Sequence, residues 1–234
     1  MNLETIHPGV HRVDLGMVNA YLLEDQGRWL IVDTGTPGSE GALLSALREA
    51  GGNPNDVAAI LVTHLHADHS GSLAALKELT GAPAWMHPVD ADAVRQGVSM
   101  RPAQPAPGVL NWLLVKVVMA ARGPMDIAPA AVERELVHGE VLDFAGGVRV
   151  IHAPGHAAGQ VCLWVERDGG VLLAADAASR MMGLGYPPIF EDQEEGLQTL
   201  RKLANLTFQT ACFGHGNPLR EGAAEVFQQK WGGR

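Results

Sequence analysis

Short runs of apolar residues, separated by turn-forming residues, follow one another along most of the chain. The runs have the length and composition of β-strands, and Asp25-Gln26-Gly27 is a hairpin-type turn between two of them. In the first half the predicted strands are 10–15, 18–23, 29–32, 58–62 and 82–87. In the second half they are 132–137, 141–144, 148–152, 161–165, 171–174 and 210–213. The first three are expected to form an antiparallel sheet.

Helices are predicted at 39–50, from about 68 to 80, at 88–96 and at 221–229. In the first of these Ser39 is an N-cap residue, and leucines follow at helical spacing before Gly51 stops the helix. Strand 58–62 is apolar at every position, which is typical of a strand that is covered on both faces. Two strand-rich halves, each with helices, therefore predict two sheets packed face to face with helices outside, in a single domain over residues 1–234.

The stretch from about 98 to 129 departs from this pattern and is predicted to be an insert. It begins with a proline-rich segment and continues into 109–121, where Asn111 and Lys116 are the only strongly polar residues. This run is too short to cross a bilayer, which takes about 20 residues, so stable membrane insertion is not expected. A helix that is apolar on most sides needs cover. It is a lid over a site for apolar substrates, a helix buried in a homodimer interface or against the domain, or a peripheral membrane contact. The side chains to examine are Trp112, Leu113 and Met119.

Charge and cysteine content narrow the class of protein. The formal net charge is -9 and the 17 Lys and Arg residues are scattered, so a nucleic-acid partner is not expected. Residues 1–7 have neither the basic start nor the apolar core of a secretory signal. Cys162 and Cys212 lie in apolar runs, which favours buried free thiols over a disulfide. We therefore expect a cytoplasmic protein that acts on a small molecule.

The densest set of side chains that can bind a metal ion lies at 63–69, directly after an apolar strand. His64 and His66 point to the same side if the chain stays extended there, because side chains alternate along a strand. Asp68 and His69 then fall in the first turn of the predicted helix, where the helix dipole favours a carboxylate. Four nitrogen and oxygen donors at such short spacing predict half of a metal site. The alternative is a surface loop rich in histidine.

The pattern His64-x-His66-x-Asp68-His69 resembles the signature of the metallo-β-lactamase superfamily, and four further motifs of that family occur in order. They are Ile31-Val32-Asp33-Thr34-Gly35, Pro154-Gly155-His156, Ala174-Ala175-Asp176 and Gly214-His215-Gly216. The motifs span 33–215, so the resemblance covers most of the chain. It implies an α/β fold that is a four-layer αββα sandwich of two mixed β-sheets with outer helices.

The resemblance also implies roles for individual residues. His64, His66 and His156 would hold one divalent metal ion, Asp68, His69 and His215 a second, and Asp176 would bridge the two. Zinc is the expected metal, with iron or manganese as alternatives. Asp68 is also a candidate proton acceptor. Asp33 would support a ligand from behind, or it is a plain turn residue. Tyr186, ten residues after Asp176, is a candidate substrate contact. The histidines expected to be structural are His7, His11, His87, His138 and His152.

The chemistry implied is hydrolysis, in which a metal-bridging hydroxide attacks the carbonyl of a small ester, lactone or thioester. β-Lactams and phosphodiesters are alternative substrates within the same superfamily. A thioesterase of the glyoxalase II type would need a C-terminal helical domain, which the residues after His215 are too few to form. A competing enzyme class is a mononuclear iron persulfide dioxygenase that uses His64, His156 and Asp176. A protein that binds metal without catalysis is a third alternative.

Overall fold

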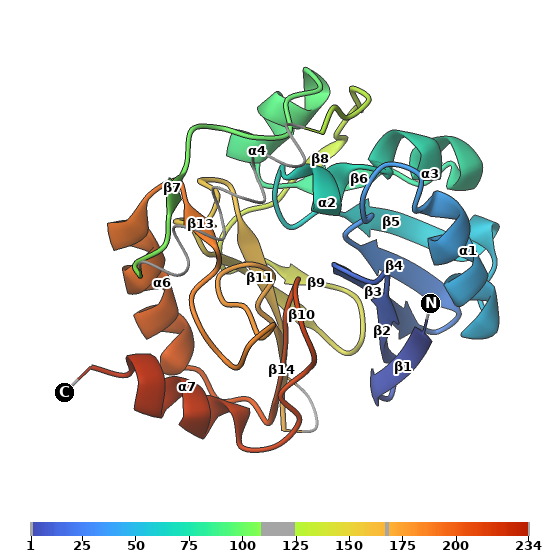
Figure 1. The fold of residues 1–234 in the computed structure, drawn as a ribbon. Coiled ribbons are helices and arrows are strands. Elements are labelled where there is room, and N and C mark those ends of the chain that lie inside the picture. The colour runs from blue at the N-terminus through green and yellow to red at the C-terminus, as the bar shows by residue number, and fades with distance from the viewer. Residues whose placement is uncertain (1, 109–124, 167–168, 234) are drawn as a thin grey trace.

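The computed structural model describes residues 2–108, 125–166 and 169–233, and Figure 1 shows their arrangement. The apolar run 109–121, with Trp112, Leu113 and Met119, lies outside these residues. The predicted lid, interface or membrane role of the insert therefore stays a prediction. Within the described ranges, no helix is both long and apolar enough to span a membrane.

The first sheet contains seven strands in the order β1-β2-β3-β4-β5-β6-β8. Their bounds are β1 Asn2–His7, β2 Val10–Asp14, β3 Asn19–Asp25, β4 Arg28–Val32, β5 Val57–Leu61, β6 Ala84–Met86 and β8 Arg134–Glu135. The strands from β1 to β4 pair antiparallel, as predicted for 10–32, and those from β4 to β8 pair parallel. The sheet is therefore mixed.

The second sheet contains five strands in the order β14-β12-β11-β10-β9. Their bounds are β9 Val141–Leu142, β10 Val148–His152, β11 Val161–Val165, β12 Val171–Leu173 and β14 Thr210–Cys212. All pairs are antiparallel except β12 with β14, which is parallel. A further small sheet joins β7 (Gln104–Pro105) to β13 (Ile189–Phe190) and so ties the start of the insert to the second half of the chain.

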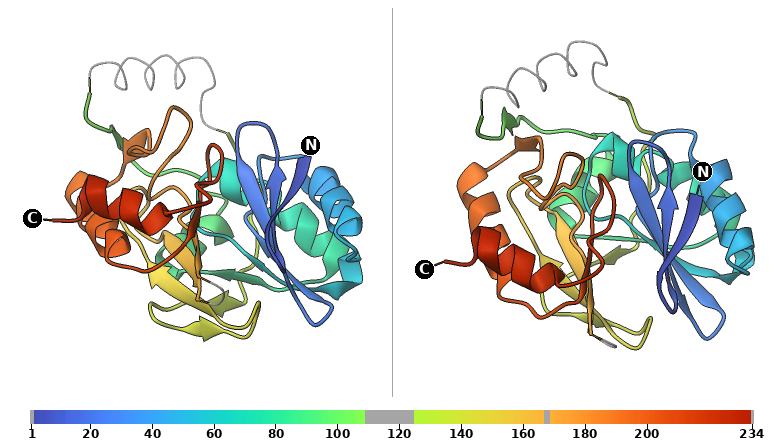
Figure 2. Two further views of the ribbon diagram at one scale, coloured as in Figure 1. Left: turned by 90° about the horizontal axis from the view of Figure 1, so that it is seen from below. Right: turned by 60° about the horizontal axis from the view of Figure 1, so that its bottom comes forward.

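Helices cover the outer faces of both sheets. They are α1 Glu40–Glu49, α2 Ala67–Ser70, α3 Leu73–Thr80, α4 Pro88–Arg95, α6 Gln193–Ala204 and α7 Ala223–Trp231, with a 3-10 turn at Pro54–Asp56. Figure 1 shows α1 and α3 on one side of the molecule, α6 and α7 on the other, and the strands between them. The views in Figure 2 show the same order of layers, with the two halves of the chain on opposite sides. This is the predicted αββα sandwich.

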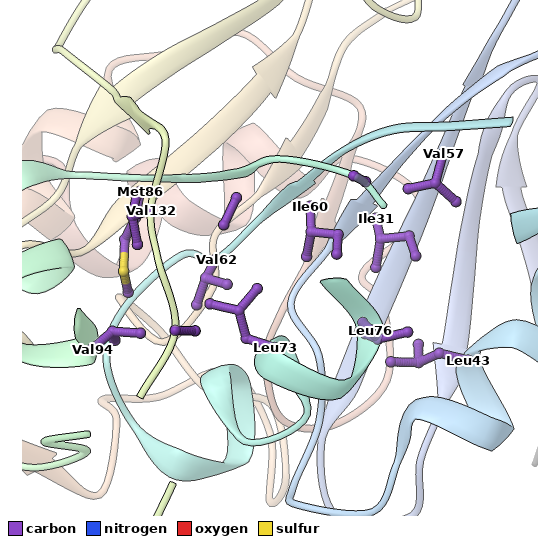
Figure 3. Close-up of a cluster of buried hydrophobic side chains, with 14 of the residues drawn as sticks. Ile31, Leu43, Val57, Ile60, Val62, Leu73, Leu76, Met86, Val94 and Val132 are labelled. Atoms are coloured by element: carbon purple, nitrogen blue, oxygen red, sulfur yellow. The ribbon is translucent and has the colours of Figure 1, made fainter. Parts of the chain in front are cut away.

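Three buried cores hold the layers together. Ile60 and Val62 point toward α1 and α3, in the cluster drawn in Figure 3, whereas Ala59 and Leu61 point toward the second sheet. The alternation along one strand explains why residues 58–62 are apolar at every position. The third core lies between the second sheet and α6 and α7 and includes Phe227. Cys162 and Cys212 are buried free thiols, as predicted.

The helix predicted from about 68 to 80 is divided. It forms as α2 and α3, because the Gly71 N–H donates to Gly35 O (3.0 Å) and the Ser72 N–H to Thr34 Oγ1 (3.2 Å). These tertiary bonds dock the break onto the loop after β4. Four features were not predicted: β1, the 3-10 turn at Pro54–Asp56, the small sheet, and α6. The sequence did contain an N-cap residue for α6, Asp192, whose side chain accepts the Glu195 N–H at 2.9 Å.

Candidate metal centre

The candidate ligands lie where several strands end. β4 and β5 are parallel neighbours, and Asp33 follows the first while His64 follows the second. In the other sheet β10, β12 and β14 run in one direction, and they are followed by His156, Asp176 and His215. Parallel strands end at the same sheet edge, which is where α/β sheets place their ligands. The topology thus brings five separate segments to one place.

His64, His66 and His156 form a first group of buried side chains. Each offers a ring nitrogen, and these nitrogens lie within 4.8 Å of one another. His66 Nδ1 is 2.9 Å from His156 Nε2. The His156 Nδ1–H donates to Ile189 O at 2.9 Å, which leaves a lone pair on Nε2 facing the group.

Asp33 lies directly behind the candidate ligands. Its Oδ1 accepts the Thr63 N–H (2.7 Å), and its Oδ2 accepts the Thr63 hydroxyl (3.0 Å) and the His69 Nδ1–H (2.9 Å). Because the Thr63 hydroxyl gives its hydrogen to Asp33, its oxygen is free to accept the His64 Nδ1–H at 3.0 Å. One carboxylate therefore orients two imidazoles through their Nδ1 atoms, so that the Nε2 of each is the nitrogen left to bind a metal ion.

Asp68, His69 and His215 form a second group, whose ligand atoms also lie within 4.8 Å of one another. The His215 Nδ1–H donates to Met17 O at 2.6 Å, and its Nε2 is 3.3 Å from Asp68 Oδ2. The Asp68 side chain is 29% exposed, whereas His69 is fully buried. This group is therefore the more open of the two.

Asp176 lies between the groups. Its Oδ2 is 3.5 Å from His156 Nε2 and 3.1 Å from His215 Nε2, and its Oδ1 is 3.6 Å from His69 Nε2. A Cβ on Gly214 would be 2.0 Å from Asp176 Oδ1, so only glycine allows this close approach. Ala175, the residue before Asp176, has a φ of 46°, an unfavourable left-handed conformation of the kind found where function demands it.

Four buried atoms of the site have no hydrogen-bond partner among the described residues. They are Nε2 of His64, His66 and His69, and Oδ1 of Asp176. Buried polar atoms are normally paired, so unpaired imidazole nitrogens beside a carboxylate oxygen are the arrangement expected of side chains that bind a metal cation. Imidazole and carboxylate are the donors that zinc and similar ions take. These residues fit a pair of divalent cations.

The two groups differ in protonation. Burial, aided by the neighbouring histidines, holds the pKa of His64 well below its ordinary value, and burial lowers the pKa of His66 to about 3. Burial also acts to lower the pKa of His69, but Asp33 and Asp176 outweigh it and raise that pKa to about 9. In the same way, Asp176 and Asp68 outweigh burial and raise the pKa of His215 to about 12. Without metal, the first group is neutral and the second holds protons that a cation would displace.

A pocket of about 660 Å³ opens beside the second group, with Asp68 and His215 in its wall. The rest of the wall is largely apolar and is formed by Leu15, Met17, Val18, Pro37 and Met125. Thr36 and Asp126 complete the lining. A small molecule in this pocket would therefore meet the ligand groups on one side and apolar side chains on the others.

Tyr186 occupies a different neighbourhood. Its ring is 6.2 Å from that of Phe190 and 6.4 Å from that of Trp231, and its side chain is partly exposed. Among the described contacts none joins Tyr186 to the seven candidate ligands. Its suggested contact with substrate stays a prediction.

Sequence reasoning missed several residues that hold the site in place. Thr63 links Asp33 to His64, as described above. Asn19 donates through Nδ2 to Phe213 O (2.9 Å) and Gly216 O (2.8 Å), and so holds the loop that carries His215. The polar side chain of Asn19 in an otherwise apolar strand was a readable signal, but its partners nearly 200 residues away were not.

Comparisons with known proteins agree with this geometry. The metallo-β-lactamase superfamily model matches residues 13–215. A probable metallo-hydrolase, YflN of Bacillus subtilis, is 26% identical over 90% of this chain and 85% of its own length. An N-acyl homoserine lactonase of a Bacillus species is 24% identical over 90% and 85%. In fold, a Cronobacter sakazakii metallo-β-lactamase matches with a TM-score of 0.72 at 19% identity, covering 92% of this chain and 81% of that one. By sequence and by fold, this chain belongs to the metallo-β-lactamase superfamily, a superfamily of metal-dependent hydrolases.

Proposed function

We propose that this protein is a dinuclear metal-dependent hydrolase of small esters, lactones or thioesters that carry an apolar acyl part. The observation that supports this most strongly is the convergence of seven side chains into two groups of three that share Asp176. A structural metal site would need only one closed group, whereas two groups around a shared carboxylate leave coordination positions open.

In this proposal His64, His66 and His156 hold one ion, and Asp68, His69 and His215 hold the other. Asp176 bridges them, since its two oxygens lie within 3.6 Å of histidines from both groups. Zinc is the metal that we expect, because imidazole and carboxylate ligands suit it. Asp33 keeps His64 and His69 in the tautomers that bind metal.

The bound ions would lower the pKa of a coordinated water from about 15.7 toward about 7 and polarise the carbonyl oxygen of the substrate. Asp68 is suited to accept the proton that this water releases, because its carboxylate lines the pocket and is partly exposed.

The pocket wall supports the apolar acyl part of the substrate. Met17 and Met125 are 57% and 36% exposed, and methionine adapts its shape to varied apolar ligands. The lactonase of a Bacillus species, to which 90% of this chain aligns, has by its name an acyl-bearing lactone as substrate. It supports lactones as the first substrates to test.

The test is reconstitution of the metal-free protein with zinc, followed by hydrolysis assays on lactones, thioesters, β-lactams and phosphodiesters of graded acyl length. The proposal requires about two bound zinc ions per chain, turnover of at least one carbonyl substrate, and a rate that rises with acyl length. A parallel reconstitution with iron(II) is assayed on a persulfide, and one bound iron ion together with oxygen consumption there would refute the proposal in favour of the dioxygenase alternative. Binding without turnover of any of these substrates would refute it as well.

A further inference from the structure

A buried carboxylate outside the ligand set joins two of the loops that carry ligands. Asp90 lies in α4 and has no exposed surface. Its Oδ2 accepts the Leu65 N–H at 3.0 Å, and its Oδ1 accepts the Gly159 N–H at 3.0 Å. Leu65 stands between His64 and His66, and Gly159 is three residues after His156. One side chain thus holds the backbone beside every histidine of the first group.

Two further charged residues extend this contact. Arg101 donates through Nη2 to Asp90 Oδ1 and through Nε to both carboxylate oxygens of Glu191, each at 3.1 Å. Glu191 Oε2 accepts the Ala158 N–H at 2.9 Å, and the Glu191 N–H donates to His156 O at 3.3 Å. The chain Asp90-Arg101-Glu191 therefore closes around the loop that presents His156.

Asp90 and Gly159 are closely packed against each other. A Cβ at Gly159 would lie 2.5 Å from the Asp90 carboxyl carbon and from its Oδ1, and 2.7 Å from the Asp90 backbone nitrogen. The φ of Gly159 is one that other residues adopt, so the obstacle to a side chain there is Asp90, through its carboxylate and its backbone. Glycine at this position lets the backbone N–H approach Asp90 closely.

The second group is held by other residues. His69 donates to Asp33, and His215 donates to Met17 O. The described hydrogen bonds of Asp90, Arg101 and Glu191 to the ligand loops end on the backbone of Leu65, His156, Ala158 and Gly159, and none reaches the rings of His69 or His215 or the loop that carries His215. Asp33 contacts both groups, whereas among the described contacts Asp90 holds the backbone on both sides of the first group alone.

We propose that Asp90, Arg101 and Glu191 form a positioning network that sets the metal affinity of the first group and leaves that of the second unchanged. The inference rests on the proposed function, in which the two groups hold separate ions. The network acts through the main chain of the ligand loops. The three residues are positioning residues, since none touches the ligand rings.

The test measures cobalt(II) affinity in two backgrounds that each leave one group complete. His215→Ala leaves the first group, and His156→Ala leaves the second. Asp90→Asn keeps the side-chain volume but retains one oxygen where three donors converge. With that oxygen at the Oδ1 position, which two donors share, the Leu65 N–H still faces an amide N–H₂. In the His215→Ala background we expect cobalt affinity to fall by about 10 to 100-fold, the range found for partners behind metal ligands. In the His156→Ala background we expect no change.

The matched control is Asp92→Asn, which makes the same chemical change in the same helix. Asp92 is exposed and pairs with Arg95 at 2.9 Å, away from the ligand loops. It should alter neither affinity. Equal weakening by Asp90→Asn in both backgrounds would show a general role in the fold and overturn the proposal, as would no weakening in either.

Gly159→Ala provides a second route if Asp90→Asn does not fold, because it keeps every charge and pushes Asp90, carboxylate and backbone together, away from Gly159. It should produce the same selective loss, and an unchanged first-group affinity would overturn the network. Protein without these substitutions should bind two cobalt ions. Binding of fewer would refute the dinuclear function and the network with it, whereas normal binding with unselective variants refutes the network alone.

Discussion

Replacing Asp33 by Asn tests the idea that one buried carboxylate prepares both groups of ligands. Asp33 is 2% exposed and has a φ of 63°, a conformation that Asn tolerates better than most residues. The substitution therefore removes the charge and one acceptor without forcing the backbone to move. Alanine would mix this effect with strain and is the poorer choice.

The magnitude follows from the hydrogen bonds that are lost. Asp33 accepts three, and the amide oxygen of Asn at the Oδ2 position keeps the two from the Thr63 hydroxyl and the His69 Nδ1–H, now without the negative charge. The Thr63 N–H would then face an amide N–H₂. A buried donor left unpaired costs about 1 to 3 kcal/mol, so the metal-free protein should lose about that much stability.

Metal binding should fall unequally. His69 contacts Asp33 directly, whereas His64 is linked to it only through Thr63. We therefore expect the second ion to be weakened by about 10 to 100-fold, or about 1.4 to 2.8 kcal/mol, and the first ion by less. Calorimetric zinc titration and thermal unfolding measure the two effects.

The control is Asp143→Asn, since the Asp143 side chain is fully exposed and paired only with Arg28 at 3.5 Å among the described ion pairs. This control should change neither quantity. An Asp33→Asn protein with unchanged affinity for both ions would refute the tautomer argument. A loss of stability without any loss of affinity would reduce Asp33 to a turn residue.

Three other predictions follow from the site. Asp176→Asn and His66→Ala should each lower turnover by more than about a hundredfold while the protein stays folded, because they remove proposed metal ligands. Steady-state rates measure the loss, circular dichroism checks the fold, and full activity would refute the ligand assignment. Metal uptake at pH 7 should release about two protons, because the pKa values of His69 and His215 are about 9 and about 12 without metal. Metal affinity should therefore fall as the pH is lowered. Calorimetry in buffers of different ionisation enthalpy counts the released protons, and zero release would contradict this prediction. Asp126→Lys in the pocket wall should raise kcat/KM for anionic relative to neutral esters by about fivefold at low salt, because a charge change of two at roughly 8 Å in water gives about 1 kcal/mol. Asp143→Lys makes the same charge change outside the pocket wall and should leave this ratio unchanged. An equal effect of both substitutions would refute a local role of Asp126.

Some local features could have been predicted and were not. Asp90 lies on the buried face of α4 with Ala91 and Val94, and an acidic residue on an apolar helix face is a sign of a buried carboxylate. The sequence contains that sign, but it does not reveal the partners. Leu65, Arg101 and Gly159 are 11 to 69 residues from Asp90, and only the packing of α4 against both ligand loops brings them together.

By itself the sequence determined the two-sheet, helix-covered architecture and the chemical identity of the candidate ligands. Side-chain periodicity marks the strands and helices, and donor spacing within a few residues marks 64–69 as a metal motif. His156, Asp176 and His215 followed from the resemblance to the family. The sequence did not locate the division between the sheets, because the strand predicted at 132–137 was grouped with the second half but pairs, as β8, with β6 of the first sheet.

Only the tertiary structure decided how those ligands meet. The parallel pairing of β4 with β5 and of β12 with β14 places Asp33 behind His64, and Asp176 beside His215. It also decided which nitrogen each imidazole turns to the centre, and that helix 68–80 breaks at Gly71 to dock on the loop after β4. Strand order and these long-range hydrogen bonds depend on how the whole chain packs, so the free energies that select them are spread over residues far apart in the sequence.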